Sequence, residues 1–138
     1  MARHAFRGIL AGEPVGRGEF STALGLSPAE ADAAIERHVG RGTMVVEDGR
    51  VVAARGLSLP PTPHVLDMAG RRFHAFCAVD AVAIPIALAL DAAIASACAG
   101  CGSPLALRVR DGVVSEAPAE VVIWAAERDP ERSLRAHT

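Results

Sequence analysis

The sequence lacks four residue types altogether, namely lysine, tyrosine, asparagine and glutamine. All 14 basic residues are therefore arginine, and aromatic residues make up only 4% of the 138 positions. We interpret this bias as the mark of a GC-rich genome and not of a function. The net charge of −2 excludes a basic field over the whole chain, so strong non-specific binding to nucleic acid is not expected.

Several catalytic and targeting signals are also missing. There is no glycine-rich phosphate loop, no Gly-x-Ser-x-Gly and no His-Glu-x-x-His. The first 12 residues are charged and lack the apolar core of a secretory signal. The longest apolar stretch, residues 75–99, contains Asp80 and Asp91, and each carboxylate would cost roughly 2.5–3.5 kcal/mol inside a bilayer. We therefore expect a buried element of a soluble protein.

What is present is sufficient for a packed core. Hydrophobic residues make up 51% of the chain, and with so few aromatics the core must consist of alanine, valine, leucine and isoleucine. The predicted fold class is α+β. The predicted organisation is a winged-helix-like module, a proline-rich connector, a core with a small mixed or antiparallel sheet and one or two helices, and a charged tail, over residues 1–56, 57–63, 64–126 and 127–138.

The N-terminal module is predicted to contain three helices and a β-hairpin. Ser27, Pro28 and Glu30 combine an N-cap, a proline at the first helical position and a capping-box glutamate. The pair Asp48-Gly49 between two apolar runs is typical of a hairpin turn. This layout is that of a winged helix, for which DNA binding is one hypothesis. The third helix is acidic, however, which favours a structural or dimerising role and leaves a homodimer open.

The core is predicted to begin with a second hairpin, which leads to a helix. The predicted elements in chain order are a hairpin at 64–74, a helix at 78–90 interrupted near Pro85, a strand at 92–98, a hairpin at 105–114 and a last strand at 121–124.

Cys77 and Asp80 lie at the start of the predicted core helix. The spacing of three residues places both side chains on one face. The helix N-terminus is expected to lower the pKa of the thiol, and the carboxylate can accept or return a proton. The pair is thus a candidate thiolate nucleophile or metal ligand with its own acid–base partner. The alternative is a buried free cysteine beside a capping aspartate.

Cys98 and Cys101 form a Cys-x-x-Cys motif, which can bind a soft metal or form a redox pair. A closed zinc site needs two further ligands, and His64 and His74 are each expected to face solvent or pair within their hairpin. Otherwise Cys98 is a small core residue and Cys101 an exposed turn thiol. Three cysteines, an odd number, favour reduced thiols and a cytoplasmic location.

Taken together, these residues resemble the organomercurial lyase (alkylmercury lyase) family over residues 6–124. The segments that carry the resemblance are the N-terminal module, the run Arg-Arg-Phe-His-Ala-Phe-Cys-Ala-Val-Asp at 71–80, Pro85, and Cys98 followed by Gly-Ser-Pro-Leu at 102–105. The resemblance implies that Cys77 binds mercury as a thiolate, that Asp80 handles the proton delivered to carbon, and that Cys98 is structural.

The sequence resembles a shortened member of that family. The family uses a second mercury-binding cysteine nearer the C-terminus, whereas no cysteine follows Cys101 here. The second thiolate could come from Cys101, from a low-molecular-weight thiol or from another subunit.

The expected reaction is protonolysis of a carbon–mercury bond to hydrocarbon and Hg(II). No cofactor is expected, Hg(II) is a substrate-derived ligand, and a small-molecule thiol is expected to help remove it. The alternatives are a non-catalytic protein that binds Hg, Zn or Cu, and a thiol-dependent lyase acting on another small organic substrate.

Overall fold

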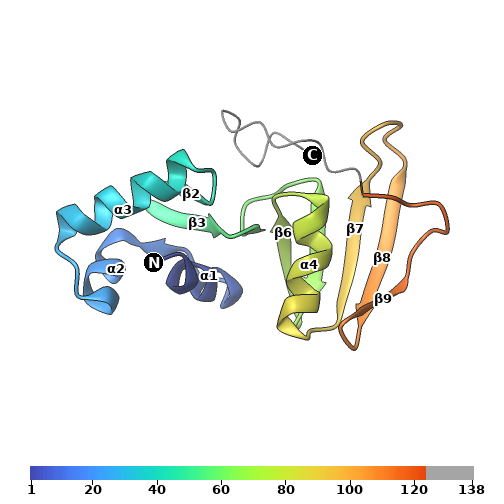
Figure 1. Ribbon diagram of the computed structural model, residues 1–138, viewed down its shortest axis with the longest axis horizontal. Helices are drawn as coiled ribbons and strands as arrows, with labels where there is room; N and C mark the ends of the chain where they lie inside the picture. Colours follow the sequence, from blue (N-terminus) through green and yellow to red (C-terminus); the bar gives the residue numbers. More distant parts are fainter. Residues whose placement is uncertain (124–138) are drawn as a thin grey trace. The chain divides into compact units, whose positions relative to one another are not determined.

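The computed structural model describes residues 1–123 (Figure 1). Two compact units make up the chain, the first spanning Met1–Pro60 and the second beginning at Pro61. No helix in this described part is long and apolar enough to cross a membrane. The predicted tail at residues 127–138 lies outside the described residues.

The first unit contains the three predicted helices, α1 (Ala2–Leu10), α2 (Arg17–Leu24) and α3 (Pro28–Gly40). At the start of α3, Ser27 accepts the Glu30 backbone N–H while the Glu30 carboxylate returns to the Ser27 backbone, so the predicted capping box is confirmed. The side chains that form the core of the unit come from all three helices and all four strands, and they include Ile9, Phe20, Ile35, Met44 and Val51.

Four strands complete the first unit. They are β1 (Val15–Gly16), β2 (Met44–Glu47), β3 (Arg50–Ala54) and β4 (Leu57–Ser58), with β3 pairing antiparallel to the other three. The hairpin from β2 to β3 turns at Asp48 and Gly49, both with positive φ (47° and 73°), as predicted for an Asp-Gly turn. Three helices followed by this hairpin give the predicted winged-helix-like arrangement.

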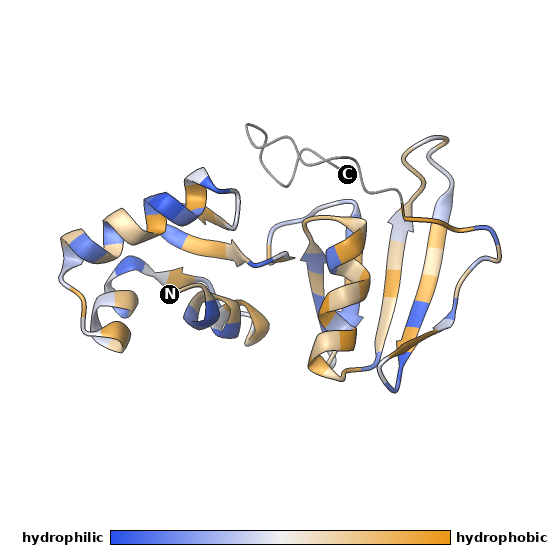
Figure 2. Ribbon diagram, viewed as in Figure 1, coloured by the Kyte–Doolittle hydropathy of each residue, from blue (hydrophilic) through white to orange (hydrophobic). Residues whose placement is uncertain are grey.

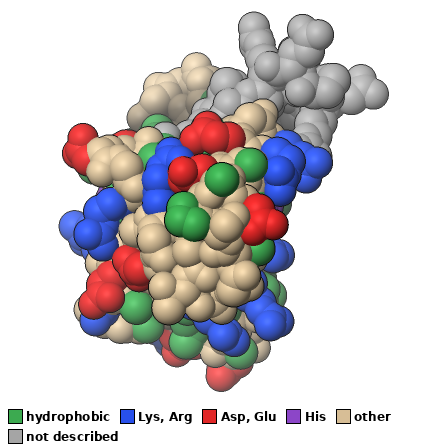
Figure 3. All heavy atoms as spheres, turned by 90° about the vertical axis from the view of Figure 1, so that its left-hand side faces the viewer, with side chains coloured by type: hydrophobic (Ala, Val, Ile, Leu, Met, Phe, Trp, Pro, Cys, Tyr) green, Lys and Arg blue, Asp and Glu red, His purple; other side chains and the backbone are tan. Residues whose placement is uncertain are grey.

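The acidic side of α3 is partly neutralised within the unit. Arg17 on α2 donates to Asp32 at 2.9 Å and to Glu36 at 3.0 Å. On the face shown in Figure 3, acidic and basic side chains are interspersed, and neither sign gathers into a continuous patch. This face therefore does not offer the concentrated positive charge that contacts with nucleic-acid phosphates require.

In its described residues, the second unit has a five-stranded antiparallel sheet with one helix packed on it (Figure 1). The strands are β5 (His64–Met68), β6 (Arg71–Ala75), β7 (Ala92–Ala97), β8 (Pro104–Arg110) and β9 (Val113–Glu116), in the spatial order β6-β5-β7-β8-β9. Leu66 pairs with Phe73 on one side and with Ile94 on the other, and Ile94 pairs with Leu107. Because side chains alternate along a strand, these residues form one continuous apolar face.

Helix α4 (Ala78–Leu88) covers that apolar face, burying Ala81, Ile84 and Pro85. Figure 2 shows hydrophobic residues along most of its length. The predicted interruption near Pro85 is wrong, because the helix continues to Leu88. Packing of Pro85 and its neighbours on the sheet offsets the backbone hydrogen bond that a proline cannot donate.

The strand predicted at 121–124 is also wrong. Val121 donates its backbone N–H to Pro118 in a turn at 3.1 Å, and the side chain of Val122 is 80% exposed. The strand that pairs with β8 is instead β9 (Val113–Glu116). Trp124 lies outside the described residues. The other predicted hairpins form, and their turns at Ala69-Gly70 and Asp111-Gly112 have positive φ throughout.

Candidate functional site

Cys77 occupies the N-cap position of α4. Its backbone is extended (φ −150°), and its Sγ accepts the backbone N–H of Asp80 at 3.3 Å. Serine, threonine or aspartate usually takes this position, because a side-chain oxygen satisfies one of the free N–H groups of the first turn. Here a sulfur atom does so. The β6 strand and the buried Phe76 deliver the chain to this point.

The predicted pairing of Cys77 with Asp80 is present. The thiol donates to Asp80 Oδ2 at 3.1 Å, so the two residues are joined by two hydrogen bonds in opposite directions. Both side chains are only partly exposed. Sequence spacing alone places them in contact, because residues three apart share a helix face.

The pKa of the Cys77 thiol is raised above its ordinary value, chiefly by burial. The Asp80 backbone N–H lowers this pKa, but the Asp80 carboxylate raises it again by accepting the thiol hydrogen and by its negative charge. The expectation of a lowered pKa at the helix N-terminus is therefore wrong. Desolvation and the neighbouring carboxylate outweigh the helix dipole and its N–H groups, so the thiol keeps its proton until a ligand displaces it.

His64 lies close to this pair, a position that sequence reasoning did not assign. Its side chain is buried, at 6% exposure, and its Nδ1 lies 2.7 Å from Ser96 Oγ on β7. Burial lowers the pKa of His64, and the Asp80 carboxylate opposes that shift. The expectation that His64 faces solvent or pairs within its own hairpin is wrong. The feature that brings His64 to Ser96 is the pairing of β5 with β7. Val65 pairs with Ala95, so the next residues on the two strands, His64 and Ser96, lie opposite each other.

His74 belongs elsewhere. Its Nδ1 lies 3.2 Å from the Thr62 backbone, just ahead of β5. It pairs in register with Val65, whereas His64 pairs with Ala75, so the two histidines point to opposite faces of the sheet. The structure does not bring them together.

Cys98 and Cys101 lie in the loop between β7 and β8, and all three cysteines of the chain are free thiols. The Cys101 thiol donates to Ser103 Oγ at 3.2 Å. Hydrogen bonds from Ser103 and from the Cys98 side chain lower the pKa of Cys101. Cys101 is exposed, whereas Cys98 is half-buried.

A cavity of about 430 Å³ connects several of these residues. Its polar lining includes His64, Ser96 and Cys98, and its remaining wall is largely apolar, with Ala78 and Ala81 from the first turns of α4. No group of three or more potential metal-ligating side chains occurs among residues 1–123. The described residues therefore do not form a closed zinc site, which needs four ligands.

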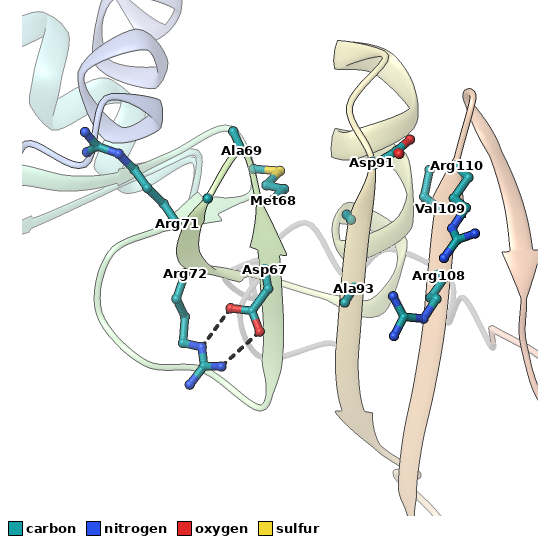
Figure 4. A pocket seen from close by; sticks show the side chains of 12 residues that line it. Asp67, Met68, Ala69, Arg71, Arg72, Asp91, Ala93, Arg108, Val109 and Arg110 are labelled. Atoms are coloured by element: carbon teal, nitrogen blue, oxygen red, sulfur yellow. Dashed lines mark hydrogen bonds and ion pairs between the residues drawn. The ribbon is translucent and has the colours of Figure 1, made fainter.

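A wider depression of about 820 Å³ lies elsewhere on the sheet (Figure 4). Arg72 and Asp67 form an ion pair at 2.8 Å on its wall, and Arg108 and Arg110 extend from β8. Neither a cysteine nor a histidine lines it. Cys98 and His64 line the smaller cavity instead.

A thiol that caps a helix and is hydrogen-bonded to a carboxylate, on a helix whose Ala78 and Ala81 line an apolar cavity, defines a class of thiol-dependent site for a small substrate. The sequence model of the alkylmercury lyase family matches residues 57–138, which include all of these groups. The chain belongs to the alkylmercury lyase family.

Individual relatives agree with this assignment. An alkylmercury lyase from Pseudomonas putida is 32% identical over 130 residues, which cover 94% of this chain and 60% of the relative. One from Staphylococcus epidermidis is 38% identical over 91 residues, covering 65% of this chain and 42% of the relative. A crystal structure of the mercury-bound form of MerB2 superposes with a TM-score of 0.91 at 29% identity, covering 99% of this chain and 68% of that one. The chain therefore spans about half of the curated relatives' length.

Proposed function

We propose that this protein cleaves the carbon–mercury bond of an organomercurial, R–Hg–X, by protonolysis to R–H and Hg(II). The observation that carries the proposal is the contact of the Cys77 thiol with the Asp80 carboxylate at 3.1 Å. Membership of the alkylmercury lyase family supports it. Cys77 acts as nucleophile and mercury ligand, and Asp80 as proton acceptor and donor.

The first step is exchange of ligands at mercury. Sγ of Cys77 bonds to mercury, X leaves as an anion, and the thiol proton passes to Asp80 along the hydrogen bond that already joins them. The raised pKa of Cys77 fits this sequence, because the proton is still on sulfur when the substrate arrives and is then available to the carboxylate. The products are R–Hg–S(Cys77), protonated Asp80 and free X.

The second step returns that proton to carbon. A further thiolate bonds to mercury and raises the electron density on carbon, protonated Asp80 delivers its proton, and the carbon–mercury bond breaks. Hydrocarbon leaves, Asp80 is again a carboxylate, and Hg(II) is held by Cys77 and the incoming thiolate. Because the Cys101 thiol is already hydrogen-bonded to Ser103, we assign the incoming thiolate to a low-molecular-weight thiol and keep Cys101 as the alternative.

The test is release of hydrocarbon from an arylmercury compound in excess monothiol. Cys77→Ser keeps a helix-capping oxygen, so the fold is expected to survive while the soft donor is lost. We expect Cys77→Ser and Asp80→Ala each to lower the release rate at least about 100-fold. The matched control is Ala87→Ser, at an exposed position of α4 that does not line the cavity and leaves both groups intact. Release from either site variant at the parent rate would refute the proposed roles.

A second candidate function is binding of a soft metal ion without cleavage. It is favoured by one observation, namely that among the described residues a single thiol, Cys77, contacts Asp80. Tight retention of the organomercurial by the parent protein, with no hydrocarbon released over many hours, would select this function.

A further inference from the structure

The loop between β7 and β8 holds two thiols in a defined geometry. The backbone N–H of Cys98 donates to Ser103 O at 2.9 Å, and that of Gly102 donates to Cys98 O at 2.8 Å. Gly102 has φ +73°, a conformation that other residues rarely adopt. These contacts close a short loop over residues 99–102, so the positions of both cysteines are fixed relative to the strands.

The two cysteines of this loop influence each other. The Cys101 thiol donates to Ser103 Oγ at 3.2 Å, and the pKa of Cys101 is lowered by Ser103 and by the neighbouring Cys98 side chain. Cys98 lines the 430 Å³ cavity beside His64 and Ser96, whereas Cys101 is exposed. The pair therefore reaches from the cavity to the surface.

The donor set selects the kind of ion. Thiolates prefer soft cations, and zinc or iron would require further ligands to complete a tetrahedral site. No third potential ligand joins the two cysteines in the described part of the chain. Two sulfur donors without a third suit an ion that is satisfied by two-coordinate thiolate binding, which is the preference of Hg(II).

We propose that Cys98 and Cys101 form a chelating dithiol site for Hg(II), separate from the Cys77–Asp80 pair. Binding of the aqueous ion forms two sulfur–mercury bonds and releases two protons. When the Hg(II) is instead held by Cys77 and a small thiol, it exchanges onto Cys98 and Cys101. Two sulfur–mercury bonds form, two break, and the protons of Cys98 and Cys101 pass to the two sulfurs that leave the ion. The supply of Hg(II) by cleavage rests on the proposed function, whereas binding of the free ion does not.

The test uses inorganic Hg(II) and the full chain carrying Cys77→Ser, so that the catalytic thiol is absent. Affinity is measured by competition with a monothiol, with the ultraviolet sulfur-to-mercury absorption and proton release as readouts. We expect one ion and two protons per chain. We expect Cys101→Ser, an exposed position, and Cys98→Ser each to lower affinity at least about 100-fold, because chelation is lost. Ala87→Ser, an exposed substitution outside the loop, should leave the affinity within about threefold.

Equal affinity in the Cys101→Ser and parental chains would overturn the dithiol site, as would failure of the Cys77→Ser protein to retain Hg(II) against the monothiol. Neither outcome depends on cleavage. A chain that chelates Hg(II) through Cys98 and Cys101 yet releases no hydrocarbon would refute the proposed function alone.

Discussion

The Cys77 and Cys101 thiols show opposite responses of one chemical group to its surroundings. Cys77 is half-buried and faces a carboxylate, and both conditions raise its pKa. Cys101 is exposed, and hydrogen bonds from Ser103 and Cys98 lower its pKa. The difference shows that a helix N-terminus does not by itself make a reactive thiolate. Desolvation and the nearest charge decide which thiol keeps its proton.

The largest expected difference between the two thiols is in hydrocarbon release. With excess monothiol present, Cys101→Ser should leave the release rate within about threefold of the parent, whereas Cys77→Ser lowers it at least about 100-fold. The measurement is headspace analysis of the hydrocarbon under identical conditions. A fall in the release rate of Cys101→Ser as large as that of Cys77→Ser would instead indicate that Cys101 is the second mercury ligand.

Alkylation should separate the thiols by a smaller factor. At pH 7.5 a larger fraction of Cys101 is thiolate, and the side chain is accessible, so we expect it to react with iodoacetamide at least about tenfold faster than Cys77. Peptide mass spectrometry after timed quenching gives both rates in one sample. Equal rates would show that burial and Asp80 do not protect Cys77.

The capping role of Cys77 predicts a difference in stability. Cys77→Ala removes the acceptor for the Asp80 N–H and should lower the free energy of unfolding by about 1 kcal/mol relative to Cys77→Ser. At the exposed position, Cys101→Ala and Cys101→Ser should differ by less than about 0.5 kcal/mol. Urea denaturation of the four variants measures both differences. A Cys77→Ala protein as stable as Cys77→Ser would show that capping of α4 by this side chain does not stabilise the fold.

The smallest expected effect concerns His64, which lines the smaller cavity. Burial lowers the pKa of His64 in the folded state, so the unfolded chain binds a proton first as pH falls. Stability should be full above about pH 6.5, the unfolded value, and should decline as pH falls below it. His64→Gln should reduce this decline between pH 7.5 and 5.5, leaving the similar contribution of His38. An unchanged decline would show that His64 is not buried in solution.

Local sequence patterns predicted much of this molecule. The capping residues before α3 predicted the start of that helix, and the Asp-Gly pairs predicted hairpin turns, because both depend on contacts between residues close in sequence. The spacing of Cys77 and Asp80 predicted their contact for the same reason. The errors have a common physical cause. The continuity of α4 through Pro85 depends on packing against the sheet. Whether residues 121–123 form a strand depends on which segment pairs with β8. Both are contacts between residues distant in sequence.

The site errors have the same origin. The contact of His64 with Ser96 joins residues 32 positions apart, and only the register of β5 and β7 brings them together. The pKa of Cys77 depends on burial, which local spacing does not reveal. Sequence therefore identified the contact between Cys77 and Asp80 but not its environment.

In the proposed mechanism, Asp80 returns to carbon the proton that Cys77 gives up. The most direct measurement is intact-mass spectrometry of the protein after exposure to an arylmercury compound and removal of excess reagent. In chains that also carry Cys98→Ser and Cys101→Ser, Asp80→Ala should accumulate one arylmercury adduct on Cys77 and give it up to added monothiol only as the intact arylmercury thiolate, while the chain that keeps Asp80 loses the aryl group as hydrocarbon. Release of the aryl group from Asp80→Ala as hydrocarbon at the parent rate would contradict the role of Asp80 as proton donor.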